Sequence, residues 1–111
     1  MQVEDIRQHL TNRLKEEHCF WSYEDSSVRE LSDDLLVEMV LLHLDIEDID
    51  LLFKILPYKT VKKIWIEYVI PQGERYYLMN VFFAWFYFHV KNPKRYVKAM
   101  MTRALNKRIA A

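Results

Sequence analysis

The chain has very few residues that break or turn the backbone. Its 111 residues include one glycine and three prolines. Tight β-hairpin turns depend on glycine, asparagine and proline, so a chain this poor in turn-formers has little room for hairpins. The composition therefore favours helices joined by short loops.

Cysteine is also nearly absent. Cys19 is the single cysteine, so no disulfide can form within the chain, which is typical of a reducing compartment. The first ten residues carry acidic side chains and no apolar run, unlike a signal peptide. We therefore expect a cytoplasmic protein.

No hydrophobic run is long enough to span a bilayer. A membrane helix needs about 17–25 mainly apolar residues, whereas the uncharged stretch around Trp85 runs only from Tyr76 to Val90 and includes Asn80 and His89. Hydrophobic residues make up 51% of the chain and charged residues 29%, which is a globular composition. The sequence thus predicts a soluble protein that does not contact membranes.

Apolar residues recur at helical spacing through most of the chain. Val3, Ile6, Leu10 and Leu14 lie three or four residues apart, which predicts an amphipathic helix over residues 3–18. Similar patterns predict further helices over residues 32–43, 45–56, 60–70 and 93–108.

Polar residues and prolines mark the ends of these helices. Ser32 and Asp45 are placed to cap two helices. Pro57 and Pro71 are placed to end the two helices of a hairpin, and Pro93 is placed to open the last helix.

The stretch VFFAWFYFHV, residues 81–90, contains six aromatic residues and no charge. Its residue types also suit a buried strand, but the run continues without interruption from Glu74, a length that favours a helix. A helix that is apolar nearly all round is buried by its neighbours. We expect an all-α single domain over residues 1–111, a compact bundle of five or six short helices around this central aromatic helix.

The zero net charge conceals a separation along the chain. Residues 1–56 hold fourteen acids and five Lys or Arg, and residues 57–111 hold two acids and eleven Lys or Arg. Two interpretations stay open, since the halves can neutralise one another within one chain or can direct the docking of a partner or of a second copy as a homodimer.

No pattern typical of catalysis or of a cofactor is present. Cys19 and His18 are adjacent, so their side chains do not converge as in a nucleophile–base pair. The histidines lack metal-ligand spacing, and Gly73 alone cannot form a phosphate-binding loop. The acids between Asp45 and Asp50 are explained by helix capping and surface charge. We therefore expect no metal, no cofactor and no enzymatic activity.

The C-terminal helix predicted over residues 93–108 is rich in basic residues. It contains no acid, and such a helix can lie against phosphates. The alternative is a solvated face whose cations interact favourably with the helix dipole. The candidate nucleic-acid-binding residues are Arg95, Lys98, Arg103 and Lys107.

Several segments together resemble a small bacterial family of uncharacterised helical proteins. These segments are CFWSYED, LVEMVLLHLDIEDIDLLFKILPYKTVKKIW and NVFFAWFYF, within residues 19–90. Members of that family resemble antitoxin-type partners and are often encoded beside a nucleotidyltransferase-like toxin. The matching positions are Phe20, Trp21, Asp45, Asp48, Leu52 and Ile64. The resemblance implies a non-enzymatic protein that binds and masks a protein partner such as a toxin.

Aromatic residues near loops are the candidate anchors for such a partner. Aromatic side chains dominate many protein interfaces, although each of these residues can instead be buried in the core. The candidate partner-binding residues are Phe20, Trp21, Tyr23, Tyr76 and Tyr77.

Overall fold

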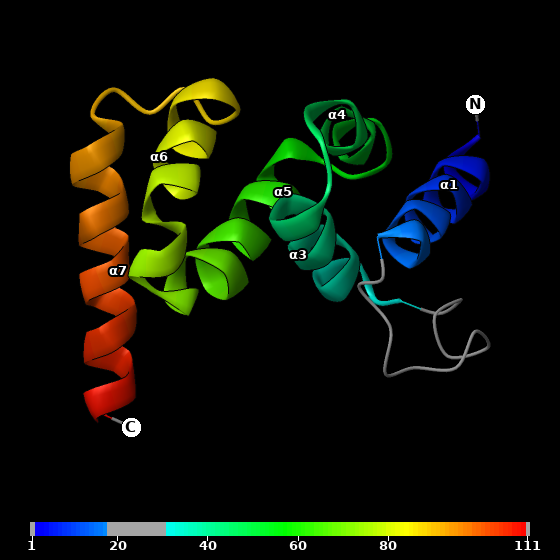
Figure 1. Cartoon of the computed structure of the whole chain (residues 1–111). Helices are drawn as coiled ribbons and strands as arrows, with labels where there is room; N and C mark the ends of the chain where they lie inside the picture. Colours follow the sequence, from blue (N-terminus) through cyan, green and yellow to red (C-terminus); the bar gives the residue numbers. More distant parts are fainter. Residues whose placement is uncertain (1, 18–30, 111) are drawn as a thin grey trace. The chain divides into compact units, whose positions relative to one another are not determined.

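The computed structural model describes residues 2–17 and 31–110, and these residues form helices joined by short connections (Figure 1). No β-strand occurs within these two ranges, so the predicted all-α fold class is confirmed. The elements are α1 (Val3–Glu16), α3 (Asp33–His43), α4 (Ile46–Ile55), α5 (Tyr58–Ile64), the π-helix η1 (Trp65–Val69), the 3₁₀ helices η2 (Ile70–Gln72) and η3 (Glu74–Tyr76), α6 (Tyr77–Phe86) and α7 (Pro93–Ala110).

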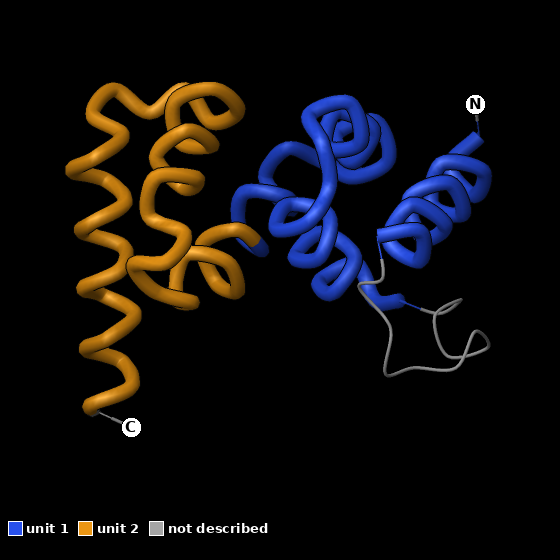
Figure 2. The backbone as a smooth tube through the Cα atoms, viewed as in Figure 1, with its two compact units in different colours: residues 1–64 blue, residues 65–111 orange. Residues whose placement is uncertain are grey.

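The chain divides into two compact units, unit 1 over residues 1–64 and unit 2 over residues 65–111 (Figure 2). Contacts are concentrated within each unit. The prediction of one domain over residues 1–111 therefore stays a prediction.

Unit 1 is built on the apolar stripe of α1. Ile6, Leu10 and Leu14 are buried where α1 packs against α3 and α4, as their spacing predicts, whereas Val3 is exposed in the first turn. Burying a leucine side chain contributes about 1.5–3 kcal/mol to stability. The predicted stripe is thus the face that holds α1 in unit 1.

The two predicted helix caps differ in how they act. Ser32 is the N-cap of α3, and its Oγ accepts a hydrogen bond of 3.2 Å from the backbone N–H of Leu35. Asp45 occupies the N-cap position of α4, but its side chain makes no capping hydrogen bond. Its carboxylate lies 3.7 Å from the guanidinium of Arg13 instead. The prediction is correct for Ser32 and wrong for the Asp45 side chain, because a cation competes for the carboxylate.

A cluster of ion pairs joins α1 to α4. The Arg13 guanidinium contacts Glu16 at 3.0 Å and Glu17 at 3.2 Å, and its Nε lies 3.4 Å from Asp48 Oδ2. His9 Nε2 lies 3.5 Å from the other oxygen of Asp48. The hydrogen bond to Glu16, supported by Asp48 and Glu17, raises the pKa of Arg13, so Arg13 remains a cation. Asp48 lies in the first turn of α4 and is a buried ionic partner rather than a surface charge.

The core of unit 2 forms around Trp65. This indole is fully buried and stacks on Phe88, with ring centroids 4.6 Å apart, and on Tyr96 at 6.1 Å. Its Nε1–H donates a hydrogen bond of 3.0 Å to Oδ1 of the buried Asn80. The bond satisfies the polar atom that a buried tryptophan brings into an apolar core. Trp65 therefore joins η1, α6 and α7.

The aromatic helix is shorter than the sequence predicts. The run from Glu74 begins as the 3₁₀ helix η3, and α6 ends at Phe86 rather than Val90. His89 adopts a left-handed conformation with φ 52°, and the N–H of Val90 returns to the carbonyl of Ala84. Histidine tolerates this region better than most residues, so the turn forms without glycine. The His89 side chain is exposed at this turn.

α7 begins at Pro93, as predicted, and runs antiparallel to α6 (Figure 1). Val97 is fully buried against the unit 2 core. Near the C-terminal end, the Arg108 guanidinium donates a hydrogen bond of 2.9 Å to the carbonyl of Pro71 in η2. α7 is thus fixed to α6 and to η2, and its opposite side faces solvent.

Candidate functional site

α6 is apolar on two opposite faces, but only one of them is buried. Asn80, Phe83 and Ala84 form the buried face. On the outer face Leu78 is 76% exposed and Trp85 is 60% exposed. The prediction that neighbouring helices bury the aromatic helix on all sides is therefore wrong for this outer face. The outer residues, called here the α6 stripe, are Leu78, Val81, Phe82 and Trp85.

The rings around the α6 stripe pack against one another. Phe82 stacks on Phe86 with centroids 5.1 Å apart and planes at 12°, and it lies 6.2 Å from Trp85. Phe86 also meets Tyr87 edge-on at 4.9 Å. Stacked and edge-on pairs add about 0.5–1.5 kcal/mol each beyond the burial of their area. These contacts hold the outer rings in place, so Trp85 is exposed but not isolated.

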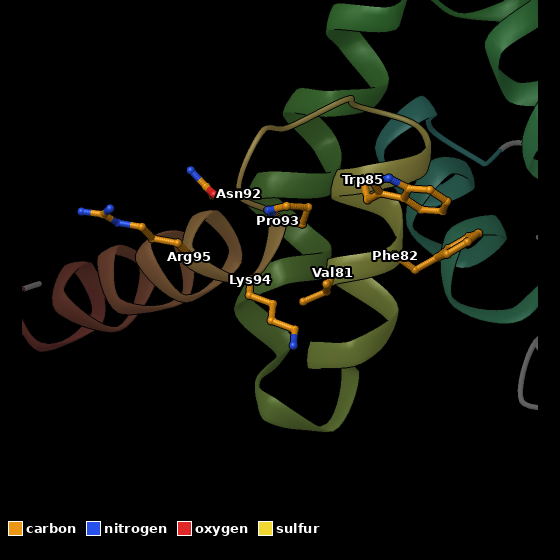
Figure 3. A pocket seen from close by; sticks show the side chains of 7 residues that line it. All are labelled: Val81, Phe82, Trp85, Asn92, Pro93, Lys94 and Arg95. Carbon is orange, nitrogen blue, oxygen red and sulfur yellow. The ribbon is translucent and has the colours of Figure 1, made fainter.

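A cavity of about 510 Å³ opens beside the α6 stripe (Figure 3). Phe82 and Trp85 project from the same side of α6, while Asn92, just before α7, and Arg95, in its first turn, project the other way (Figure 3). Cavities of this size accommodate small ligands or anchoring side chains. Its lining combines apolar, neutral polar and cationic groups, which are Val81, Phe82, Trp85, Asn92, Pro93, Lys94 and Arg95.

The cations of unit 2 have no acidic partners in the described part of this unit. Unit 2 contains eight Lys or Arg and two acids, a formal charge of +6, and no ion pair forms among residues 65–110. The Lys98 ammonium instead lies 6.0 Å from the centroid of the Tyr77 ring, at the outer limit of a cation–π contact. The side of unit 2 that carries α7 therefore presents positive charge to solvent.

The predicted partner-binding residues do not form the α6 stripe. Phe20, Trp21 and Tyr23 lie outside the described residues. Tyr76 and Tyr77 are half-buried at the start of α6, where the Arg75 guanidinium lies 5.4 Å from the Tyr76 ring centroid and Lys98 lies over Tyr77. Tyr76 is thus the last residue of η3 and Tyr77 the first residue of α6.

Sequence reasoning missed the α6 stripe because it assigned the whole run to the core. The signal was present, since residues 78, 81, 82 and 85 recur at i, i+3, i+4 and i+7. A second apolar face on the same helix hid the pattern, because Asn80, a polar residue within α6, lies on the buried face rather than the exposed one.

The predicted nucleic-acid-binding residues are all exposed on α7, but they do not form one site. Lys98 and Arg103 are five residues apart, which places them about 140° apart around a helix. Arg95 lines the cavity beside the α6 stripe, whereas Arg103 and Lys107 line a second depression together with Glu67. The four cations therefore divide into two groups, one of which has an acid beside it.

Two kinds of site have no counterpart in the described ranges 2–17 and 31–110. No group of three or more His, Cys, Asp or Glu side chains within them is arranged to hold a metal ion. None of the helices in these ranges combines the length and apolar character that a membrane span requires. The prediction that the protein is not an enzyme stays a prediction.

No family model, curated protein or solved structure matches the chain. The likeness to antitoxin-type proteins therefore rests on the sequence segments alone.

Proposed function

We propose that the chain is a non-enzymatic protein–protein interaction module that binds its partner through the α6 stripe. One observation carries this proposal: Trp85 and Leu78 are 60% and 76% exposed on a helix whose opposite face is buried. Contiguous exposed apolar patches with polar borders mark interaction sites, and tryptophan is enriched among the residues that dominate binding energy.

The proposed mechanism is occlusion of a protein partner in the cytoplasm, as the resemblance to antitoxins suggests. The α6 stripe supplies apolar anchors, and the exposed cations beside it supply attraction and orientation. The rings are held by their mutual stacking, so binding immobilises few rotamers and loses little conformational entropy. If the α6 stripe binds over the functional site of the partner, that site is blocked.

The experiment is affinity capture of the full chain from its source cell, with partners identified by mass spectrometry after nuclease treatment. Trp85→Ala is compared with Val3→Ala, because Val3 is also exposed, at 51%, but lies on α1. We expect one stoichiometric protein that is retained by wild type and by Val3→Ala. Loss of a hot-spot tryptophan weakens binding by about 30-fold or more, so Trp85→Ala should lose this protein.

Two results would reject the proposal. In the first, every captured protein is retained equally by Trp85→Ala. In the second, the chain binds only itself. Unit 1 carries a formal charge of −6 and unit 2 of +6, so added salt would weaken the attraction between copies. Sedimentation would then show a mass that falls as salt is added.

The second candidate is a nucleic-acid-binding protein that uses α7. The observation that favours it is the exposure of Arg95, Lys98, Arg103 and Lys107 without ion pairs in the described part of unit 2. Phosphate contacts make affinity fall steeply with salt. Oligonucleotide binding at about 50 mM salt that weakens on Arg103→Ala with Lys107→Ala would support this candidate, and no binding there would remove it.

A further inference from the structure

The spacing of the α6 stripe is that of a helix-docking surface. Leu78, Phe82 and Trp85 follow one another by one turn along a helix of ten residues, which is about 15 Å long. Such a stripe matches the i, i+3, i+4 and i+7 anchors of an amphipathic helix laid along it. The opposite face of α6 is already used for the unit 2 core, so the outer face stays open to a second helix.

A row of cations follows one long edge of this stripe. Lys98 lies beside Tyr77 at the start of α6, and Lys94 lines the cavity with Val81 one turn further along (Figure 3). The two lysines are four residues apart on α7, and therefore about one helical turn. Neither forms an ion pair within residues 65–110.

From these two features we infer that the partner presents an acidic amphipathic helix to the α6 stripe. This inference rests on the proposed function, and it names the chemistry of the partner. The helix would place apolar side chains on Leu78, Phe82 and Trp85. Carboxylates spaced i, i+4 along one edge would lie against Lys94 and Lys98, and one large side chain would enter the cavity of about 510 Å³.

Two other occupants fit the surface less well. Single-stranded nucleic acid stacks its bases on exposed ring faces, but one face of Phe82 is covered by Phe86, with planes at 12°, and Leu78 is aliphatic. A second copy docking through the same stripe would bring the α7 cations of both copies together, and like charges across an interface are unfavourable. An acidic helix meets both the apolar and the charged requirement.

The test measures binding of the full chain to three fluorescent helical peptides of about 14 residues. The peptides share one Leu/Phe stripe at i, i+3, i+4 and i+7 and differ only at the edge positions, which are Glu, Gln or Lys. A fluorescent oligodeoxythymidine is the fourth probe. Fluorescence anisotropy is recorded at about 150 mM salt, where exposed charges are already screened beyond about 8 Å.

Variants of the chain then assign the contacts. We expect the Glu peptide to bind about two- to thirtyfold more tightly than the Gln peptide, because two exposed charge pairs each contribute modestly and charge complementarity fixes the register. The double variant Lys94→Glu with Lys98→Glu should reverse the order and prefer the Lys peptide. Trp85→Ala should weaken every peptide by at least about tenfold. Arg103→Glu with Lys107→Glu, two exposed cations of α7 that line the second depression, should leave the preference unchanged.

The outcomes separate this inference from the proposed function. Equal binding of the Glu and Gln peptides, or no binding of any peptide, would overturn the acidic-helix inference. Trp85-dependent capture of a cellular protein would in that case still support the proposed interaction module. Binding of the Glu peptide that ignores Trp85→Ala would also overturn it. Trp85-dependent binding of the oligodeoxythymidine alone would overturn it in favour of nucleic acid.

Discussion

The two units differ in how their charged side chains are paired and in where their apolar side chains are exposed. In unit 1, acids and cations meet in ion pairs, as Arg13 does with Glu16 and Asp48 and as Arg7 does with Asp33 at 2.7 Å. In unit 2, no ion pair forms among residues 65–110 and the cations face solvent. Unit 1 therefore pairs part of its charge internally and keeps a formal charge of −6, whereas the cations of unit 2 are available to another molecule.

The exposed apolar residues follow the same division. Those of unit 1 lie on separate helices, with Val3 on α1, Leu35 on α3 and Ile46 on α4. In unit 2, some exposed apolar residues lie on α7 and η1, but Leu78 and Trp85 lie on one face of α6. Apolar residues scattered singly over a surface are ordinary, whereas contiguous ones mark interaction sites.

The largest expected effect on the free energy of unfolding comes from replacing one of the two tryptophans of unit 2 by alanine. Trp65→Ala removes a fully buried ring and its hydrogen bond to Asn80, and should lower the free energy of unfolding by about 3–5 kcal/mol. Trp85→Ala removes a ring that is 60% exposed, and should change it by about 0.5 kcal/mol or less. Urea titrations of both variants test this difference. Equal losses would mean that Trp85 is a core residue and that the α6 stripe is not an open surface.

The next effect tests the ion pairs of unit 1. Asp48→Asn keeps the shape of a side chain that is 8% exposed but removes its charge beside Arg13 and His9. We expect a loss of about 1–3 kcal/mol in the free energy of unfolding. Asp50→Asn on the exposed side of α4 is the matched control and should be nearly neutral. If both variants behaved alike, the cluster would not stabilise unit 1.

A smaller effect is expected at the turn between η2 and η3. Gly73 has φ 105°, and a Cβ added there would meet no atom within 4 Å. Gly73→Ala should therefore destabilise unit 2 by about 1 kcal/mol through backbone strain alone. The exposed neighbour variant Glu74→Ala provides the reference in the same thermal unfolding series. A stabilising Gly73→Ala would show that the turn changes its backbone conformation.

The smallest effect concerns pH and belongs to unit 1. Burial raises the pKa of Glu38 above its ordinary value, so the folded state binds a proton there more tightly than the unfolded state. The free energy of unfolding should then fall as the pH rises through the ordinary carboxyl pKa toward the raised one. Glu38→Gln should remove that part of the pH dependence, as measured by urea titrations at several pH values. If the pH dependence of the free energy of unfolding were the same in Glu38→Gln and wild type, the Glu38 carboxyl would be solvated in the folded state.

Local signals in the sequence were sufficient to predict most of the fold. The spacing of Ile6, Leu10 and Leu14 predicted the buried face of α1, and Ser32 and Pro93 predicted where α3 and α7 begin. The end of α6 was missed because His89 adopts the left-handed conformation that glycine usually supplies. Side-chain type gives little warning of such a turn.

The candidate site could be predicted only in part. The basic character of α7 is readable from composition, and the five-residue spacing of Lys98 and Arg103 already separates them around a helix. The α6 stripe required knowing which of two apolar faces packs against the unit 2 core. That choice is set by Trp65, which packs on Phe88 and bonds Asn80, and long-range packing of this kind is not encoded in local spacing.

The most direct test of the central claim is photo-cross-linking from the α6 stripe in the source cell. The photoreactive residue benzoylphenylalanine replaces Trp85 in one version of the chain and Val3, exposed on α1, in the other. We expect position 85 to form an adduct with one other protein and position 3 to form none. Cross-links from position 85 that stay within the chain, or the same adduct from both positions, would contradict the claim.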